Sequence, residues 1–278
     1  MMPRRLLLRL GTVCNNSCEH CTVRDLAALP ERTTEEALAE LRRARAEGCD
    51  ELVLMRGEPT IRPDLLPLVR EARALGYGHV QLQTNGRLLA SAAVLDDLVR
   101  AGVTLLEISL YGPDAAVHDA VAGAPGAFAE TTRGFAACVE RGPPLLATIP
   151  VVRANVRRLS ETVALLASLG VRAVQLNFTR PLQGGERIVS TIQEAAPEVR
   201  AAVRLGRELG LGMTVEALPP CVLGGVDQAL LRFEAAPVKI VDVHRTTTDL
   251  AELRRIYRPF APACEGCAQT GDCPVTWS

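Results

Sequence analysis

The sequence is poor in aromatic residues and carries almost no net charge. Aromatic side chains make up 3% of the 278 residues, and 31 Lys and Arg stand against 32 Asp and Glu, a formal net charge of −1. Proteins that bind nucleic acid through a basic field or through stacked bases need the features that this chain lacks. We therefore predict no nucleic-acid partner.

Long hydrophobic runs are absent as well. No stretch reaches the roughly eighteen apolar residues without charge that a membrane-spanning helix needs. The segment "MMPRRLLLRLGTVC" has the basic residues, leucines and cysteine of a lipoprotein signal, but Arg9 interrupts its short apolar run. We predict a soluble, cytoplasmic protein with no membrane partner. In that compartment the nine cysteines are expected to be metal ligands, catalytic groups or buried thiols rather than disulfides.

Short apolar runs alternate with longer amphipathic ones along the first two thirds of the chain. The candidate strands are 5–10, 51–55, 79–83, 105–110, 145–151 and 173–178. Thr33 and Glu36 form a capping-box pattern at the start of the first intervening helix, and Pro63 is placed at the start of the second. This alternation predicts an α/β fold of six βα units with a parallel sheet, an open partial TIM-like barrel.

The alternating pattern breaks after about residue 218, where the predicted strands shorten and the remaining cysteines gather. We interpret residues 1–218 as the partial barrel and residues 219–278 as a small C-terminal module.

Three cysteines, Cys14, Cys18 and Cys21, follow the first predicted strand within eight positions. Thiolates hold iron–sulfur clusters, and three of them leave one iron of a four-iron cluster open for a ligand. A zinc site is the main alternative; it would need a water or His20 as fourth ligand. Thiols without a metal are the third reading.

Further motifs stand at the ends of the successive predicted strands. They are "LMRGEPTIRPDL" (54–65), "LQTNG" (82–86), "ISLYGPDAAVHDAVAG" (108–123) and "VVRANVRRLSE" (151–161). Together with the cysteine spacing they resemble the radical S-adenosylmethionine (radical SAM) superfamily, in order, over nearly all of residues 5 to 180. The resemblance implies a [4Fe–4S] cluster on Cys14, Cys18 and Cys21, with the amino and carboxylate groups of SAM chelating the open iron.

The resemblance also assigns the SAM-binding residues. The backbone of Gly57 and Glu58 would accept hydrogen bonds from the methionine amino group, the Glu58 side chain and Pro59 would fix the turn, and Ser109 would lie near the ribose. Arg56 departs from the family pattern, because a glycine is usual there. If that position needs a positive φ, arginine is strained there; if it does not, the arginine cation is expected to reach the SAM carboxylate.

A second departure is Ala122, which stands where relatives often carry an arginine. Among the other motif residues, we expect Asn85 to make a turn, His118 and Asp119 to organise the following loop, and Asn155 to cap a helix. Cys49 and Cys138 fall in predicted amphipathic helices and are expected to be buried structural thiols.

The tail carries four more cysteines, Cys221, Cys264, Cys267 and Cys273. Four thiols fit a closed zinc site or a fully ligated iron–sulfur cluster equally well. Beside a radical SAM core they resemble the auxiliary-cluster modules called twitch or SPASM, of which the shorter twitch type fits better. An auxiliary [4Fe–4S] cluster of this kind would move an electron.

The resemblance therefore implies an oxidoreductase that cleaves SAM to a 5′-deoxyadenosyl radical, which abstracts a substrate hydrogen while the auxiliary cluster relays an electron. Maturation of a ribosomally made peptide is the leading expectation. Dehydrogenation of a small molecule in cofactor or natural-product biosynthesis is the alternative, and a non-catalytic iron–sulfur sensor or relay is a remote one. Cys14 lies so close to the N-terminus that a peptide substrate is expected to need a detached leader-binding partner. The expected reductant is a flavodoxin or ferredoxin.

Overall fold

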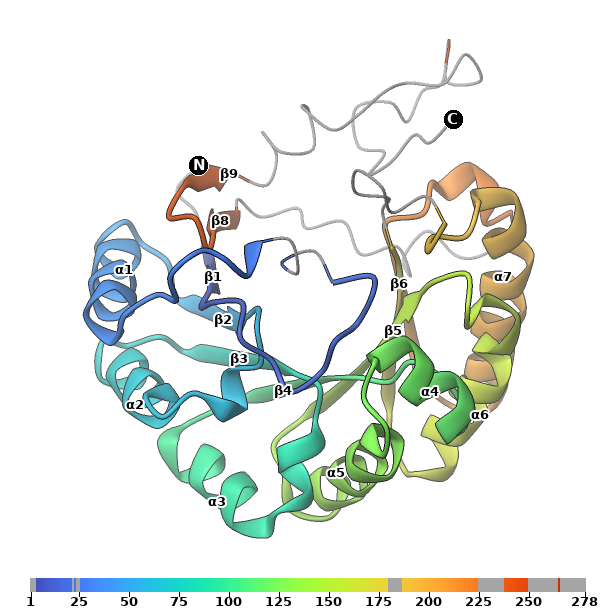
Figure 1. Ribbon diagram of the computed structural model, residues 1–278, viewed down its shortest axis with the longest axis horizontal. Coiled ribbons are helices and arrows are strands. Elements are labelled where there is room, and N and C mark those ends of the chain that lie inside the picture. The colour runs from blue at the N-terminus through green and yellow to red at the C-terminus, as the bar shows by residue number, and fades with distance from the viewer. Residues whose placement is uncertain are drawn as a thin grey trace.

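The computed structural model describes residues 4–21, 23, 26–179, 187–224, 238–249 and 265. Within these residues the strands form one sheet in the order β7-β6-β5-β4-β3-β2-β1-β8-β9. All neighbouring strands are parallel except β8 and β9, which are antiparallel. The two ends of the order do not pair, so the sheet curves without closing (Figure 1).

The predicted α/β partial barrel is confirmed, and its six predicted strands are found within one residue at each end. The strands are β1 (Arg5–Arg9), β2 (Glu51–Met55), β3 (His79–Thr84), β4 (Leu105–Ser109), β5 (Leu145–Val151), β6 (Ala173–Phe178), β7 (Gly212–Glu216), β8 (Val238–Val241) and β9 (Thr247–Asp249). The last three were not among the predicted strands. β8 and β9, with four and three residues, give too little periodicity to distinguish a strand from a loop. β7 is as long as β1 and alternates buried Met213 and Val215 with less buried residues, so its pattern was missed.

The two faces of the sheet differ sharply in polarity. In β1, Leu6 and Leu8 are fully buried, whereas Arg5 and Arg9 line an internal cavity. The same alternation continues around the barrel, because successive side chains of a strand point to opposite faces. The apolar outer face buries its leucines, valines and isoleucines against helices, while the inner face remains polar and available for a ligand.

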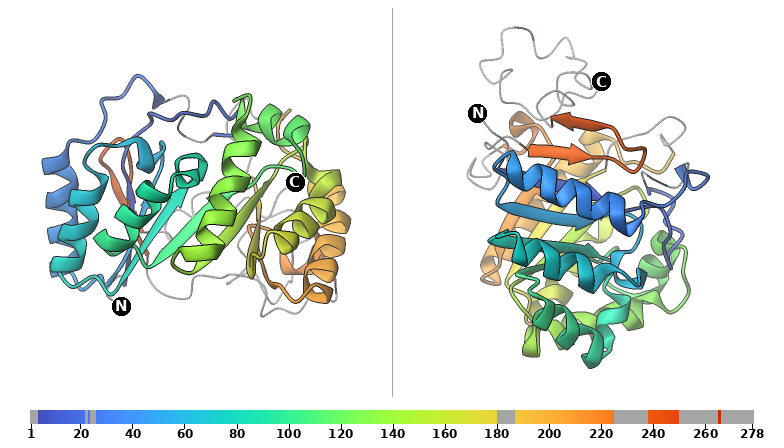
Figure 2. Two further views of the ribbon diagram at one scale, coloured as in Figure 1. Left: turned by 90° about the horizontal axis from the view of Figure 1, so that it is seen from below. Right: turned by 90° about the vertical axis from the view of Figure 1, so that its left-hand side faces the viewer.

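Seven α-helices in the described residues cover the outer face (Figures 1 and 2). They are α1 (Thr34–Ala46), α2 (Leu65–Ala74), α3 (Ala92–Ala101), α4 (Ala115–Ala122), α5 (Ala127–Arg141), α6 (Leu159–Ser168) and α7 (Ile192–Glu208). None of the described helices has the length and apolar character needed to cross a membrane.

The start of one helix was predicted correctly and that of another was not. The capping box of Thr33 and Glu36 is present at α1. Helix α2 begins at Leu65 rather than at Pro63, which lies in the preceding turn. Its N-cap residue Asp64 makes no side-chain cap; instead the carboxylate accepts hydrogen bonds from Arg62 (2.8 Å) and from the Thr34 hydroxyl (2.8 Å).

Strands β8 and β9 belong to the segment 219–278 and extend the core sheet beyond β1. In the right-hand view of Figure 2 they lie beside α1, where Arg245 forms an ion pair with Glu36 (2.7 Å). Arg9 of β1 forms a further ion pair with Asp242, which follows β8. This part of the C-terminal segment therefore packs directly on the barrel.

Candidate active site: a cysteine loop over the mouth of the barrel

A cavity of about 500 Å³ lies inside the curved sheet and reaches the ends of its strands. All three cysteines of the N-terminal loop line it, and so do Arg56, Gly57, Glu58 and Ser109. The segment between β1 and α1 crosses the mouth of the barrel toward α4 (Figure 1). The residues that were predicted to act together follow β1 and β2 and end β4, and they all line this one cavity.

Two glycine backbones hold the cysteine loop from opposite sides. Gly57 has φ +57°, and a Cβ added there would stand 2.6 Å from the Val13 carbonyl oxygen. Gly123 has φ +60°, and its Cβ would stand 2.4 Å from the carbonyl oxygen of Ser17. Neither contact leaves room for a side chain, so glycine is required at both positions. The chain on either side of Cys14 is fixed by these contacts.

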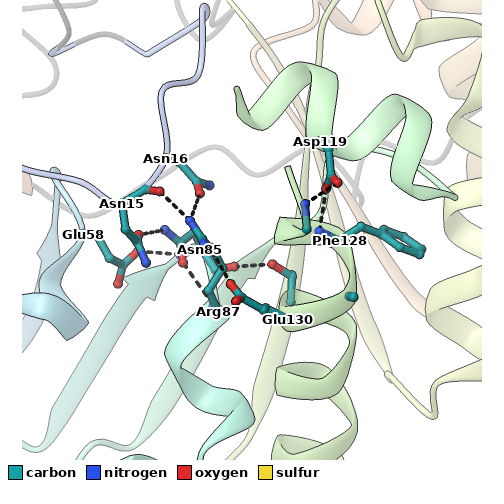
Figure 3. A network of polar contacts seen from close by, with 12 residues as sticks. Asn15, Asn16, Glu58, Asn85, Arg87, Asp119, Phe128 and Glu130 are labelled. Carbon is teal, nitrogen blue, oxygen red and sulfur yellow. Dashed lines mark hydrogen bonds and ion pairs between the residues drawn. The ribbon is translucent and has the colours of Figure 1, made fainter. Parts of the chain in front are cut away.

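Polar contacts from the end of β3 complete the support of the loop (Figure 3). The Asn85 amide donates to Asn15 Oδ1 (2.6 Å), and Arg87 donates to the Asn15 carbonyl and to Asn16 Oδ1 (3.0 Å). Arg87 is itself paired with Glu130 (2.6 Å). Sequence reasoning predicted the turn at Asn85 but not this network, because nothing local links residues 15 and 16 to residues 85 and 87.

The three thiols differ in exposure and influence one another. Cys14 is exposed, Cys21 is intermediate, and Cys18 is buried with 9% of its surface accessible. Burial, opposed by the hydrogen bond with Tyr111 and aided by the repulsion of the neighbouring Cys14 and Cys21, raises the pKa of the Cys18 thiol to about 11. Deprotonating all three therefore requires a compensating positive centre, which a bound metal centre supplies.

The donor set fits an iron–sulfur cluster. The Asn16 N–H donates to Cys14 Sγ (3.3 Å), and the Asn85 amide lies 3.9 Å from it; such donors stabilise cluster thiolates. Among the described residues, no three His, Cys, Asp or Glu side chains converge as the ligands of one metal ion do. His20, considered as a zinc ligand, packs its ring edgewise on Tyr111 (centroids 5.2 Å apart).

Glu58 ties the turn after β2 to the turn after β3. Its buried carboxylate accepts hydrogen bonds from the Thr60 hydroxyl (2.6 Å), the Thr84 hydroxyl (2.6 Å) and the Asn85 backbone N–H (2.7 Å). Burial raises the pKa of Glu58, whereas these donors oppose that rise. The Glu58 backbone N–H donates to the Val13 carbonyl (2.8 Å), and Pro59 opens a short 3₁₀ helix, Pro59–Ile61. The side chain fixes this turn, as predicted.

Arg56 has the left-handed backbone that its position was suspected to require, with φ 71°. For a residue other than glycine this conformation is strained. The side chain lines the cavity, and its Nε is buried without a hydrogen-bond partner among the described residues. Burial and the charge of Arg9 lower the pKa of Arg56 to about 10, so the group remains a cation near neutral pH.

Most other charged groups of the cavity already have partners within the chain. Arg5 pairs with Glu51 (2.6 Å), and Arg9 pairs with Asp242. Two carboxylates deeper in the barrel accept hydrogen bonds from inward-facing amides: Glu107 from Gln83 (3.0 Å), and Glu216 from Gln175 (2.7 Å). These inner residues were not predicted as site residues, although "HVQLQ" already shows a polar residue at every second position. Arg56 differs from these groups, because it lines the cavity with a strained backbone and its Nε has no hydrogen-bond partner in the described residues.

The segment after β4 meets the cysteine loop. Ser109 lines the cavity, and the Tyr111 hydroxyl lies 3.7 Å from Cys18 Sγ. Asp119 organises the next loop, as predicted, by accepting the N–H groups of Gly126 and Phe128 (2.7 Å each).

The side chain of Asn155 does not cap a helix as predicted, which is a correction. It accepts the Val152 N–H (2.9 Å) and donates to the carbonyls of Tyr111 (2.9 Å) and Pro150 (2.8 Å). Its amide is fully engaged by three backbone groups at the ends of β4 and β5. The side chain therefore links these two strand ends and is not available to cap a helix.

The remaining cysteines fall into two groups. Cys49 and Cys138 are buried, as expected of structural thiols. Cys221 is exposed, in the short 3₁₀ helix Pro220–Val222, whereas Cys264, Cys267 and Cys273 lie outside the described residues. The grouping of these four thiols therefore stays a prediction.

Known proteins resemble the chain in both sequence and fold. The family model described as the Radical SAM superfamily matches residues 8–166. An AdoMet-dependent heme synthase from Methanosarcina barkeri is 32% identical over 186 residues, 66% of this chain and 53% of that protein. A PqqA peptide cyclase from Streptomyces rochei is 34% identical over 207 residues, 72% of this chain and 55% of that protein. The chain thus spans about half the length of these curated relatives.

Among solved structures, Streptococcus suis SuiB bound to S-adenosylmethionine has a similar fold. Its TM-score is 0.74 at 15% sequence identity, and the match covers 98% of this chain and 72% of that one. At this identity the likeness concerns the fold alone, the open parallel α/β barrel described above.

Proposed function

The chain belongs to the radical SAM superfamily, and from this premise we propose that it cleaves SAM reductively and uses the product to abstract a hydrogen atom from a substrate. The family implies a [4Fe–4S] cluster and SAM as cofactors. One observation carries the proposal: the three thiols, the turn residues Arg56, Gly57 and Glu58, and the end of β4 all line a single cavity.

Cys14, Cys18 and Cys21 would hold the cluster. When bound, the cluster supplies the electron that cleaves SAM and releases the 5′-deoxyadenosyl radical. The chain's own part is to keep the loop in place through Gly57 and Gly123 and to donate hydrogen bonds to Cys14 through Asn16 and Asn85. It also encloses the reacting groups within the barrel, away from bulk water.

The SAM site would be built from the turn after β2 and the end of β4. The backbone of Gly57 and Glu58 would receive the methionine amino group, with Pro59 and the Glu58 side chain holding the turn rigid. Ser109 would contact the ribose. Since Ala122 offers no cation, Arg56 would bind the SAM carboxylate. Its unpartnered Nε supports this assignment, and the cost of its strained backbone would be offset by a charged ligand.

Replacing Arg56 by methionine is expected to weaken SAM binding about tenfold or more, because a hydrogen bond to a charged group contributes about 1.5–3 kcal/mol. Isothermal titration of the anaerobic, cluster-loaded protein with SAM measures the effect. Decarboxylated SAM should bind wild type and variant equally. Arg42→Met, which removes an exposed cation paired with Glu71 (2.7 Å), is the matched control and should bind SAM normally. Unchanged SAM affinity in Arg56→Met would remove Arg56 from the site.

For the substrate we propose a peptide. The similarity to a PqqA peptide cyclase supports this class. The inner face of the barrel adds a polar lining of Gln81, Gln83, Gln175 and Asn177, which donate to Glu107 and Glu216, and a polar cavity of this kind suits a substrate rich in hydrogen-bonding groups, as a peptide is.

The substrate class is tested with a library of random peptides, each linked to its own messenger RNA. The immobilised wild-type protein, reconstituted and loaded with SAM, should bind a defined set of peptide sequences. The control, an excess of Cys18→Ala protein without SAM, should not bind that set. If no sequence is enriched, the peptide assignment is wrong. The similarity to an AdoMet-dependent heme synthase supports a small-molecule substrate as the second candidate, and a tetrapyrrole that binds the same protein tightly would favour it.

We further propose that residues 219–278 form a twitch-like module in which Cys221, Cys264, Cys267 and Cys273 hold an auxiliary [4Fe–4S] cluster. Its role would be to accept an electron from the substrate radical that hydrogen abstraction leaves, which makes the net reaction a two-electron oxidation of the substrate. A flavodoxin or ferredoxin would reduce the core cluster. The exposure of Cys221 leaves its thiol accessible for such a cluster.

The auxiliary cluster predicts an iron content of about eight per chain, and Cys267→Ala should lower it to about four. Iron and acid-labile sulfide are measured together on anaerobically reconstituted protein, and zinc is measured in the same samples. Cys49→Ala, which removes a buried thiol outside either group, should retain the wild-type content. About four irons plus one zinc in the wild type would show that the tail binds zinc instead.

A further inference from the structure

Tyr111 places its hydroxyl group against one of the three cysteines. The Tyr111 oxygen lies 3.7 Å from Cys18 Sγ, and the residue is 6% exposed. Its ring packs between His20 and His118, with centroid distances of 5.2 and 5.1 Å. None of the functions described so far uses this side chain.

The backbone of Tyr111 is held from two directions. Its N–H donates to Nδ1 of the buried His118 (3.2 Å), and its carbonyl accepts from the buried Asn155 (2.9 Å). These contacts, together with the ring packing, fix where the hydroxyl points. The residue therefore has the fixed position that a group tuning a cofactor needs.

Cys18 belongs to a small buried cluster that also includes Tyr111, Val121 and Val152. Its sulfur lies near the Ala122 carbonyl oxygen (3.6 Å) and the Tyr111 hydroxyl (3.7 Å). A thiol can donate to the carbonyl, but a thiolate cannot. Once Cys18 is deprotonated, the phenol is the one of these two groups that can donate a hydrogen bond to the sulfur.

Ser109 extends this contact into the cavity. Burial raises the pKa of the Tyr111 phenol well above its usual value, and the side chain of Ser109, which lines the cavity, opposes that rise by hydrogen bonding. Hydrogen bonds in a chain polarise one another, so donation from Ser109 to the phenol oxygen strengthens donation from the phenol to sulfur.

We propose that Tyr111 is a positioning residue that sets the reduction potential of the core cluster by donating a hydrogen bond to the Cys18 thiolate, with Ser109 supporting that bond. The donor withdraws electron density from the ligand and favours the reduced cluster, so it shifts the potential in the positive direction. This inference rests on the proposed function, because it presupposes a cluster on Cys18.

The test is a redox titration followed by electron paramagnetic resonance on anaerobically reconstituted Tyr111→Phe, with iron content measured in parallel. The core cluster is identified as the signal that changes on adding SAM. We expect wild-type iron content and a potential shifted to more negative values, beyond the error of the titration. Tyr77→Phe is the matched control: it removes a buried hydroxyl that donates to the Leu41 carbonyl (2.8 Å), and it should leave the potential unchanged.

Ser109→Ala, titrated before SAM is added, should shift the potential in the same direction by a smaller amount. A Tyr111→Phe protein with full iron content and the wild-type potential would overturn the inference. If Tyr111→Phe loses its iron, Ser109→Ala decides, and an unchanged potential there overturns the inference equally. A wild-type protein that assembles no SAM-responsive cluster would instead contradict the proposed function, and the inference with it.

Discussion

Cys18→Ala is expected to lose the core cluster and all cleavage of SAM, while the protein stays folded. Cys18 is the buried member of the three thiols, and with two thiolates left the loop cannot hold three corners of a four-iron cluster. The fold should survive, because truncating Cys18 in its small buried cluster with Val121 and Val152 lowers the free energy of unfolding by only about 1–2 kcal/mol. Iron content, sulfide content and the SAM-responsive resonance signal measure the loss.

Cys138→Ala is the matched control for this substitution. Cys138 is buried to a similar degree in α5 but lies outside the loop, so this variant should keep both its iron and its SAM response. If Cys18→Ala retained the SAM-responsive signal, the loop would not be the site of the cluster.

Gly57→Ala is expected to abolish SAM binding at attainable concentrations and to lower the free energy of unfolding by about 1–3 kcal/mol. The new Cβ would stand 2.6 Å from the Val13 carbonyl oxygen. Because this oxygen belongs to the backbone, the clash is relieved only if the cysteine loop or the turn after β2 moves. Either movement separates the two halves of the proposed SAM site. Isothermal titration with SAM and chemical denaturation measure the two effects.

Gly210→Ala separates backbone strain from the close contact. Gly210 also has a positive φ, of 77°, but a Cβ there would meet nothing within 4 Å. This variant should show the small loss of stability that an alanine in the left-handed region causes, with normal SAM binding. Equal SAM affinity in Gly57→Ala and Gly210→Ala would mean that the contact with Val13 does not shape the site.

Much of the barrel could be predicted because each of its first six strands carries its own pattern. In β3, for example, His79–Thr84 alternates buried Val80 and Leu82 with polar residues, and in β1 two arginines flank a run of three leucines. Such patterns are local, so they can be read without knowing the neighbours. Strands β8 and β9 are defined by pairing with β1 and with each other, at four and three residues in length, and no local pattern reveals that pairing.

The candidate site could be predicted at residues whose chemistry is unusual in itself. Three closely spaced cysteines indicate metal binding wherever they occur, and an arginine before Gly57 raised the question of backbone strain that φ 71° answers. The supports of the site could not be predicted. Tyr111 reaches Cys18 across 93 positions, and Gly123 is needed because Ser17 passes over it. These contacts exist only once the barrel brings distant strand ends together.

The most direct test of the account is formation of 5′-deoxyadenosine from SAM by anaerobically reconstituted protein reduced with dithionite. Wild-type protein with a confirmed cluster should produce 5′-deoxyadenosine, Cys138→Ala should match it, and Cys18→Ala should produce none. A fully loaded wild type that binds SAM at the cluster and still forms no 5′-deoxyadenosine, with or without the peptides that it retains, would contradict the account.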